Sequence, residues 1–132
     1  MAGRWSRLKE LNRKLSALGA LLEDETISSM PEWVQFQTTY ACNLECPHCS
    51  THGTEERRRE YNYERKGMDR ELLSDVAAKS LPVADEVTLS VSGEPLATPG
   101  LEKILDEFEP YGAKLNLVTN GTTLSPQRLS YL

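Results

Sequence analysis

Residues 38–52 carry the most informative pattern in this chain and read Thr-Thr-Tyr-Ala-Cys-Asn-Leu-Glu-Cys-Pro-His-Cys-Ser-Thr-His. They contain Cys42, Cys46 and Cys49, the only three cysteines among 132 residues, in a C-x3-C-x2-C pattern. An odd number of cysteines at so tight a spacing argues against a disulfide framework. Three thiolates gathered at one point suit zinc or an iron–sulfur cluster. Because a [4Fe–4S] cube normally takes four cysteines, three would leave one iron open to a substrate or cofactor.

Two other interpretations of the cysteines stay open at this point. Positions 42, 46 and 49 also follow the i, i+4, i+7 spacing of a buried helix face. Pro47 disfavours such a helix, because proline would remove a backbone hydrogen bond and clash with the carbonyl of Asn43. A structural zinc site with three cysteines would need a fourth ligand, which His52 or His48 could supply.

Size and composition predict one compact domain. The formal net charge of −5 gives no reason to expect a nucleic-acid partner, since such proteins carry clustered basic patches. No apolar run approaches the roughly 20 residues that span a membrane, and the N-terminus has no apolar signal-peptide core. Clustered free thiols fit a reducing compartment, so we expect a cytoplasmic protein without a membrane partner.

Residues 1–30 are predicted to form an N-terminal amphipathic helix followed by a polar linker. Leucines repeat at alternating spacings of three and four, as in a coiled-coil seam, at Leu8, Leu11, Leu15, Leu18 and Leu22. We expect this leucine face to pack on the protein's own domain, with a partner-binding helix as the alternative.

Residues 31–132 are predicted to alternate strands with helices. Strands are expected at 33–40, 86–91 and 114–119, where apolar residues alternate with polar ones. Helices are expected to follow the cap residues Asp69 and Thr98, with Pro99 at the first helical position, and a last helix is expected to start at Ser125-Pro126. The charged segment 50–67 is predicted to be a solvated face, with a lid over the site as the functional alternative.

This order predicts an α/β fold with a parallel sheet. Reactive groups of such sheets collect at the C-terminal ends of the strands. Three successive strand ends here carry the cysteine loop, Gly93-Glu94-Pro95 and Thr119-Asn120-Gly121. Taken alone, the second motif is also an ordinary turn and the third also a hairpin signal. Their shared placement predicts that the three motifs form one site.

Together these segments resemble the N-terminal part of the radical S-adenosylmethionine (SAM) enzyme core. The resemblance covers about Trp33 to the C-terminus, and the cysteine motif is its most specific part. It implies a partial, TIM-like barrel in which residues 31–132 form a truncated core of the first three βα units. We expect a fragment of a longer protein, or a chain that pairs with another. The segment most resembles members that act on peptides or carry an additional C-terminal cluster (SPASM-type) domain.

The resemblance implies that Cys42, Cys46 and Cys49 each ligate one iron of a [4Fe–4S] cluster whose open iron binds SAM. The residues that it implies for SAM binding are His48, Ser92, Gly93, Glu94, Pro95, Thr119 and Asn120. His48 would lie near the adenine, the turn at 93–95 would receive the amino group, and Thr119 and Asn120 would face the methionine or ribose part. Val91 and Ser92 stand where the family often has glycine.

The implied reaction is reductive cleavage of SAM. A reduced cluster passes one electron to SAM, the C5′–S bond breaks homolytically, and the 5′-deoxyadenosyl radical takes a hydrogen atom from an unreactive C–H bond. An electron donor such as flavodoxin or ferredoxin is implied, and the substrate is not identified. Two alternatives remain from the residues alone: a non-enzymatic zinc-binding module and an iron–sulfur electron-transfer or scaffold protein.

Overall fold

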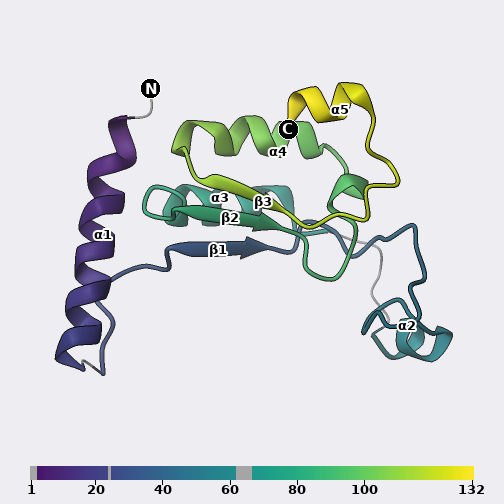
Figure 1. The fold of residues 1–132 in the computed structure, drawn as a ribbon, viewed down its shortest axis with the longest axis horizontal. Coiled ribbons are helices and arrows are strands. Elements are labelled where there is room, and N and C mark those ends of the chain that lie inside the picture. The colour runs from purple at the N-terminus through teal and green to yellow at the C-terminus, as the bar shows by residue number, and fades with distance from the viewer. Residues whose placement is uncertain (1–2, 24, 62–66) are drawn as a thin grey trace.

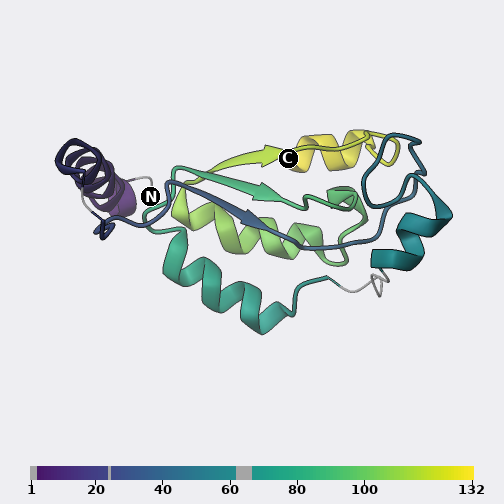
Figure 2. The same ribbon diagram turned by 90° about the horizontal axis from the view of Figure 1, so that it is seen from below.

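The computed structural model describes residues 3–23, 25–61 and 67–132, which form an α/β arrangement with an N-terminal helix (Figure 1). Within these residues, three parallel strands make one sheet in the order β1 (Trp33–Phe36), β2 (Glu86–Leu89) and β3 (Lys114–Leu117). Helices α3 (Arg70–Ser80) and α4 (Leu101–Phe108) cover one face of the sheet (Figure 2). The predicted parallel α/β fold is therefore confirmed.

The strand register sorts the side chains of the sheet into two faces. Two rows of paired apolar residues turn toward α3 and α4; they are Val34, Val87 and Leu115, then Phe36, Leu89 and Leu117. Phe36 meets Phe108 of α4 with ring centroids 5.2 Å apart. Leu73 and Ala77 of α3 complete the same buried cluster. The core therefore lies between the sheet and these two helices.

The predicted start of α3 is confirmed by its cap. The Asp69 carboxylate accepts hydrogen bonds from the backbone N–H groups of Glu71 and Leu72, both at 3.0 Å. A carboxylate in this position satisfies backbone donors that have no partner inside the helix. Leu73 and Ala77 are buried on the face of α3 that meets the sheet, whereas Leu72 is exposed.

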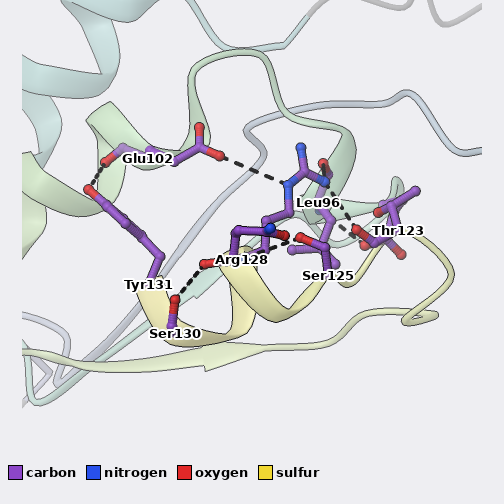
Figure 3. A network of polar contacts seen from close by, with 9 residues as sticks. Leu96, Glu102, Thr123, Ser125, Arg128, Ser130 and Tyr131 are labelled. Carbon is purple, nitrogen blue, oxygen red and sulfur yellow. Dashed lines mark hydrogen bonds and ion pairs between the residues drawn. The ribbon is translucent and has the colours of Figure 1, made fainter.

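Helix α5 (Pro126–Tyr131) begins where the sequence predicts, and Ser125 caps it by accepting a hydrogen bond from the backbone N–H of Arg128. Figure 3 shows how this helix is held against the chain before it. Arg128 Nη1 donates to the carbonyl of Leu96 at 3.1 Å, and the Tyr131 hydroxyl donates to the carbonyl of Glu102 at 3.1 Å. Both contacts join α5 to the segment that follows β2.

All three strands end earlier than the sequence predicts. Beyond Phe36 the side chain of Gln37 replaces the backbone hydrogen bonds between β1 and β2, because its Oε1 accepts from the backbone N–H groups of Val91 and Ser92. Ser90 has a φ of 57°, a left-handed conformation that ends β2. Val91 falls within the predicted strand 86–91 but is 61% exposed, because the chain has already turned.

The predicted start of α4 at Thr98 and Pro99 is wrong. A short 3-10 helix (Pro95–Ala97) occupies this region, and the Thr98 backbone N–H closes it by donating to the carbonyl of Pro95. The Thr98 hydroxyl instead lies 2.9 Å from that of Thr38 in the interior. Helix α4 starts after Gly100, whose φ of 67° suits a residue without a Cβ.

The expected packing of the N-terminal leucine face is also wrong. Helix α1 (Gly3–Leu22) forms as predicted and stands across the end of the sheet where the strands begin (Figure 1). Four of the five seam leucines are exposed, namely Leu8, Leu11, Leu18 and Leu22. The helix docks by a different face, through Asn12 hydrogen bonds to the backbone of Met30 and an Arg13–Asp85 ion pair at 2.7 Å.

The segment 50–67 contains a short helix that the sequence did not reveal, α2 (Glu55–Tyr61). Residues 62–66 of this segment lie outside the described chain, so neither the predicted solvated face nor its alternative, a lid, is tested there. None of the helices in the described ranges is long and apolar enough to cross a membrane.

Leu89 is the residue through which the core can be tested most directly. The Leu89→Ala variant should lower the free energy of unfolding by about 2–5 kcal/mol, because it leaves a cavity between the sheet and its helices. Urea denaturation measures this change. The control Leu21→Ala, at a side chain that is 79% exposed, should change it by less than about 0.5 kcal/mol. Equal losses in both variants would contradict the assigned core.

Candidate functional site

The cysteine loop lies beyond the C-terminal ends of the strands and is not helical, which excludes the helix-face interpretation of the three cysteines. Its backbone is folded back on itself, with the Cys49 N–H donating to the Cys46 carbonyl at 2.9 Å and the Gly53 N–H donating to the Cys49 carbonyl at 3.2 Å. A Cβ on Gly53 would lie 2.6 Å from the Cys49 carbonyl oxygen, so only glycine allows this close approach.

Cys49 sits among groups that favour its thiolate. The hydroxyl of Thr51 lies 3.3 Å from Cys49 Sγ, and the backbone N–H of His52 donates to the same sulfur at 3.3 Å. Arg57 Nη1 donates to the Cys49 carbonyl at 2.7 Å. The Thr51 hydrogen bond is the main cause that lowers the pKa of Cys49, and the charge of Arg57 acts in the same direction. The sequence predicted only a solvated charged segment here, but the structure shows that Arg57 contacts the cysteine loop.

Thr51 and His52, which follow Cys49, connect the cysteine loop to the turn that follows β2. His52 Nε2 lies 2.8 Å from the carbonyl oxygen of Ser92, and the Thr51 hydroxyl lies 3.2 Å from it. The His52 ring nitrogen that faces this carbonyl acts as a donor, which leaves Nδ1 as the nitrogen that could bind a metal. His48, the other candidate zinc ligand and the predicted adenine neighbour, is exposed.

The turn after β2 packs closely against the chain that leads into the cysteines. The Glu94 backbone N–H donates to the carbonyl of Ala41 at 2.8 Å. A Cβ on Gly93 would lie 2.5 Å from the carbonyl oxygen of Thr39 and 2.8 Å from that of Ala41. Glycine is therefore required at position 93, the residue that the sequence assigned to SAM binding.

Glu94 holds the ends of β2 and β3 together. Its side chain is only 2% exposed, and Oε1 accepts from the Leu96 N–H at 3.0 Å and from the Thr119 hydroxyl at 2.5 Å. Oε2 accepts from the Asn120 N–H at 2.8 Å. Three donors compensate for the removal of this charge from water. Pro95, the next predicted site residue, is buried and opens the 3-10 helix.

Asn43 joins the cysteine loop to the same cluster. Its Oδ1 accepts from Asn120 Nδ2 at 3.0 Å, and its Nδ2 donates to the Thr122 hydroxyl at 2.7 Å. The Thr122 hydroxyl in turn donates to Asn120 Oδ1 at 2.7 Å. Chain segments 77 residues apart are thereby fixed side by side, next to Cys42.

The three motifs predicted to converge therefore do so, but the three sulfur atoms are not gathered. All three cysteines are free and half-buried. No group of three or more histidine, cysteine, aspartate or glutamate side chains is arranged to hold a metal in the described ranges. A cavity of about 220 Å³ beside the loop is lined by Cys42, Thr51, His52 and Arg58, among others. Cysteine thiolates are the ligands of iron–sulfur clusters, so three cysteines on one loop, one of them with a favoured thiolate, fit such a cluster chemically.

The cysteine loop and the turns after β2 and β3 are called the junction below. Sequence reasoning missed four of its residues: Gln37, Asn43, Thr51 and Thr122. Each acts through hydrogen bonds to a segment far away in the sequence, so no spacing rule identifies it. The position of Asn43 directly after the first cysteine was the one available signal.

Comparison with known proteins finds similarity over the part of the chain that carries the sheet and the candidate site. Residues 36–132 match the Radical SAM superfamily. A 91-residue stretch is 29% identical to 7-carboxy-7-deazaguanine synthase of Haemophilus influenzae, covering 69% of this chain and 37% of that protein. The chain thus spans well under half the length of this relative.

Solved structures share the fold. The structure of BtrN in complex with AdoMet and 2-DOIA matches 78% of this chain and 41% of that one, with a TM-score of 0.56 and 20% identity. BtrN in an open conformation matches 79% of this chain and 45% of its own, with a TM-score of 0.54 and 19% identity. Identities this low speak for the fold and not for the substrate.

The role of Glu94 can be tested by Glu94→Gln. The amide cannot accept all three hydrogen bonds and places its own N–H groups against a donor, so the free energy of unfolding should fall by about 2–4 kcal/mol. Chemical denaturation monitored by circular dichroism measures the loss. Glu102→Gln, at an exposed glutamate of α4, is the matched control and should be nearly neutral. An unchanged stability of Glu94→Gln would show that the junction does not depend on this carboxylate.

Proposed function

Because this chain belongs to the radical SAM superfamily, we propose that Cys42, Cys46 and Cys49 bind a [4Fe–4S] cluster and that the adjoining turns bind SAM. The proposed reaction is reductive cleavage of SAM to start hydrogen-atom abstraction from a substrate. The observation that carries this proposal is the junction of three strand ends, where Asn43 of the cysteine loop contacts Asn120, and Asn120 contacts Glu94.

The chain's own residues prepare the cysteine loop for a cluster. Thr51, the His52 backbone and Arg57 favour the thiolate of Cys49, which is the form that ligates iron. Hydrogen bonds to the sulfurs also tune the potential of a bound cluster. When bound, the cluster would supply the electron for cleavage of SAM.

The turn at 92–95 is the proposed contact for the amino group of SAM. A carboxylate offers about four lone-pair sites, and Leu96, Thr119 and Asn120 use three of those on Glu94. One lone-pair site of the carboxylate remains, and it suits one N–H donor of the SAM amino group. Thr119 and Asn120, which the sequence assigned to the methionine or ribose part, are thereby held beside the same carboxylate.

The partners follow from this proposal. Reductive cleavage needs an external one-electron donor of the flavodoxin or ferredoxin type. The substrate pocket is not assigned, because the relatives that share the fold are longer than this chain and differ from it in most positions.

Anaerobic reconstitution with iron and sulfide tests the cluster. The wild-type chain should bind about four irons with matching sulfide, and each of Cys42→Ala, Cys46→Ala and Cys49→Ala should lose most of it. Metal and sulfide analysis together with visible absorption measure the result.

His52→Ala separates this proposal from a zinc site with three cysteines and one histidine. Metal binding should persist in His52→Ala under the proposal and should fall under the zinc alternative. A single tetrahedral zinc without inorganic sulfide in oxygen-free protein would refute the cluster.

Asn43→Ala tests whether the junction positions SAM. The variant should keep its iron, because Asn43 is not a proposed ligand. Its SAM affinity should fall by about three- to tenfold, since the loop loses hydrogen bonds to Asn120 and Thr122. Titration of SAM against the EPR signal of the reduced cluster measures this. Asn116→Ala, an exposed residue of β3, is the control. A reduced cluster whose signal ignores SAM in the wild type would point to an electron-transfer or scaffold role.

A further inference from the structure

The opposite end of the sheet holds a second cavity that the proposed function does not use. It measures about 520 Å³ and lies between α1 and the turn that follows α4. Its walls come from Trp5, Ser6, Lys9 and Arg13 on α1 and from residues 109–112. Figure 1 places α1 beside the start of the strands, whereas the cysteine loop and α2 lie past their ends. The two sites are therefore separate.

Lys9 is the unusual member of this wall. Its side chain is 7% exposed, and its Nζ has no hydrogen-bond partner among the described residues. Burial lowers the pKa of Lys9, the charge of Arg13 lowers it further, and the charge of Asp85 opposes both. An ammonium that is removed from water without an acceptor is costly, so buried lysines are as a rule paired.

The nearby acidic groups do not supply that acceptor. Arg13 Nη1 already donates to both carboxylate oxygens of Asp85 at 2.7 Å. Glu109 also lines the cavity, but it is exposed and makes no hydrogen bond to Lys9. The cavity is therefore bordered by the two basic residues Lys9 and Arg13, of which only Arg13 has a carboxylate of the described chain as its partner, and by the exposed Glu109.

The remaining wall is aromatic. Trp5 and Tyr111 lie with ring centroids 5.7 Å apart and planes inclined by 30°. Such a pair offers a flat apolar surface to a ligand. Volumes of about 300–1,000 Å³ with an apolar wall and a few placed polar groups are typical of small-molecule sites.

We propose that this cavity binds a small organic oxyanion, with its carboxylate or phosphate group on Lys9 Nζ and its apolar part against Trp5 and Tyr111. The ligand supplies the acceptor that Lys9 lacks, and Arg13 adds a second positive charge at the same wall. The site is independent of the cysteines, so it exists whether or not the chain binds a cluster.

Two tryptophans allow a direct test by NMR. The chain has only Trp5 and Trp33. The indole N–H of Trp33 donates to the Thr88 hydroxyl, and Trp33 is not among the residues that line the cavity. Benzoate and phenyl phosphate should each shift the Trp5 indole signal in a saturable manner and leave that of Trp33 unchanged. Neutral benzyl alcohol should give no saturable shift. The tighter of the two anions identifies the preferred oxyanion.

Lys9→Met tests the recognition of the anion. The variant removes the unpaired ammonium but keeps the length of the side chain, and circular dichroism verifies that it folds. Its dissociation constant for the bound anion should rise at least about tenfold, as expected for a lost charged hydrogen bond. Lys14→Met, at an exposed lysine of α1 that pairs with Glu10, should bind like the wild type.

Two results would overturn the proposal. One is the absence of a saturable Trp5 shift with both anions in the wild type. The other is equal binding by Lys9→Met and Lys14→Met. The first result does not depend on any variant, so it decides the question even if a substitution disturbs the fold.

Discussion

The carboxylate of Glu94 receives hydrogen bonds from Leu96, Thr119 and Asn120 at the point where two strands end. A buried charge must be satisfied from within the protein, because the cost of leaving it unpaired exceeds that of ordering its donors. The donors come from the 3-10 helix after β2 and from the turn after β3, so one side chain determines how these connections lie. Asn120 in turn donates a side-chain hydrogen bond to Asn43 and so fixes the cysteine loop beside these connections. The geometry of the candidate site depends on this chain of contacts.

The same end of the sheet shows why the strands are short. A side-chain amide replaces the ladder hydrogen bonds beyond β1, because Gln37 accepts from the backbone of Val91 and Ser92. Thr38 lies within 3 Å of the hydroxyls of Ser90 and Thr98, which places a buried polar contact where the strands would otherwise continue. The chain is thus released from the ladder just before the cysteines and the turn at 92–95. Loops that carry reactive groups require such freedom, while the strands beneath them provide a rigid base.

The two ends of the sheet are organised by different physics. The C-terminal end is held by hydrogen bonds from uncharged donors to one buried carboxylate, with the half-buried cysteines beside it. The N-terminal end is held by α1 through Asn12 and through the Arg13–Asp85 ion pair. Because α1 docks with its polar side, four of its five seam leucines stay exposed and Lys9 is buried beside the aromatic pair. An amphipathic pattern states that a helix has an apolar face, but it does not state which face the domain will use.

The sequence by itself determined the order of the three strands and of α1, α3, α4 and α5, the parallel sheet, the cap at Asp69, the start of the last helix at Ser125, and the three motifs at the strand ends. These features are local, because strand alternation, cap chemistry and cysteine spacing act over a few residues. Only the tertiary structure decided where the strands stop, that Thr98 turns inward instead of capping α4, and which face of α1 docks. It also decided that Asn43, Thr51 and Gln37 belong to the site. Those outcomes depend on hydrogen bonds between segments 18 to 77 residues apart, and no local pattern encodes the partner of such a bond.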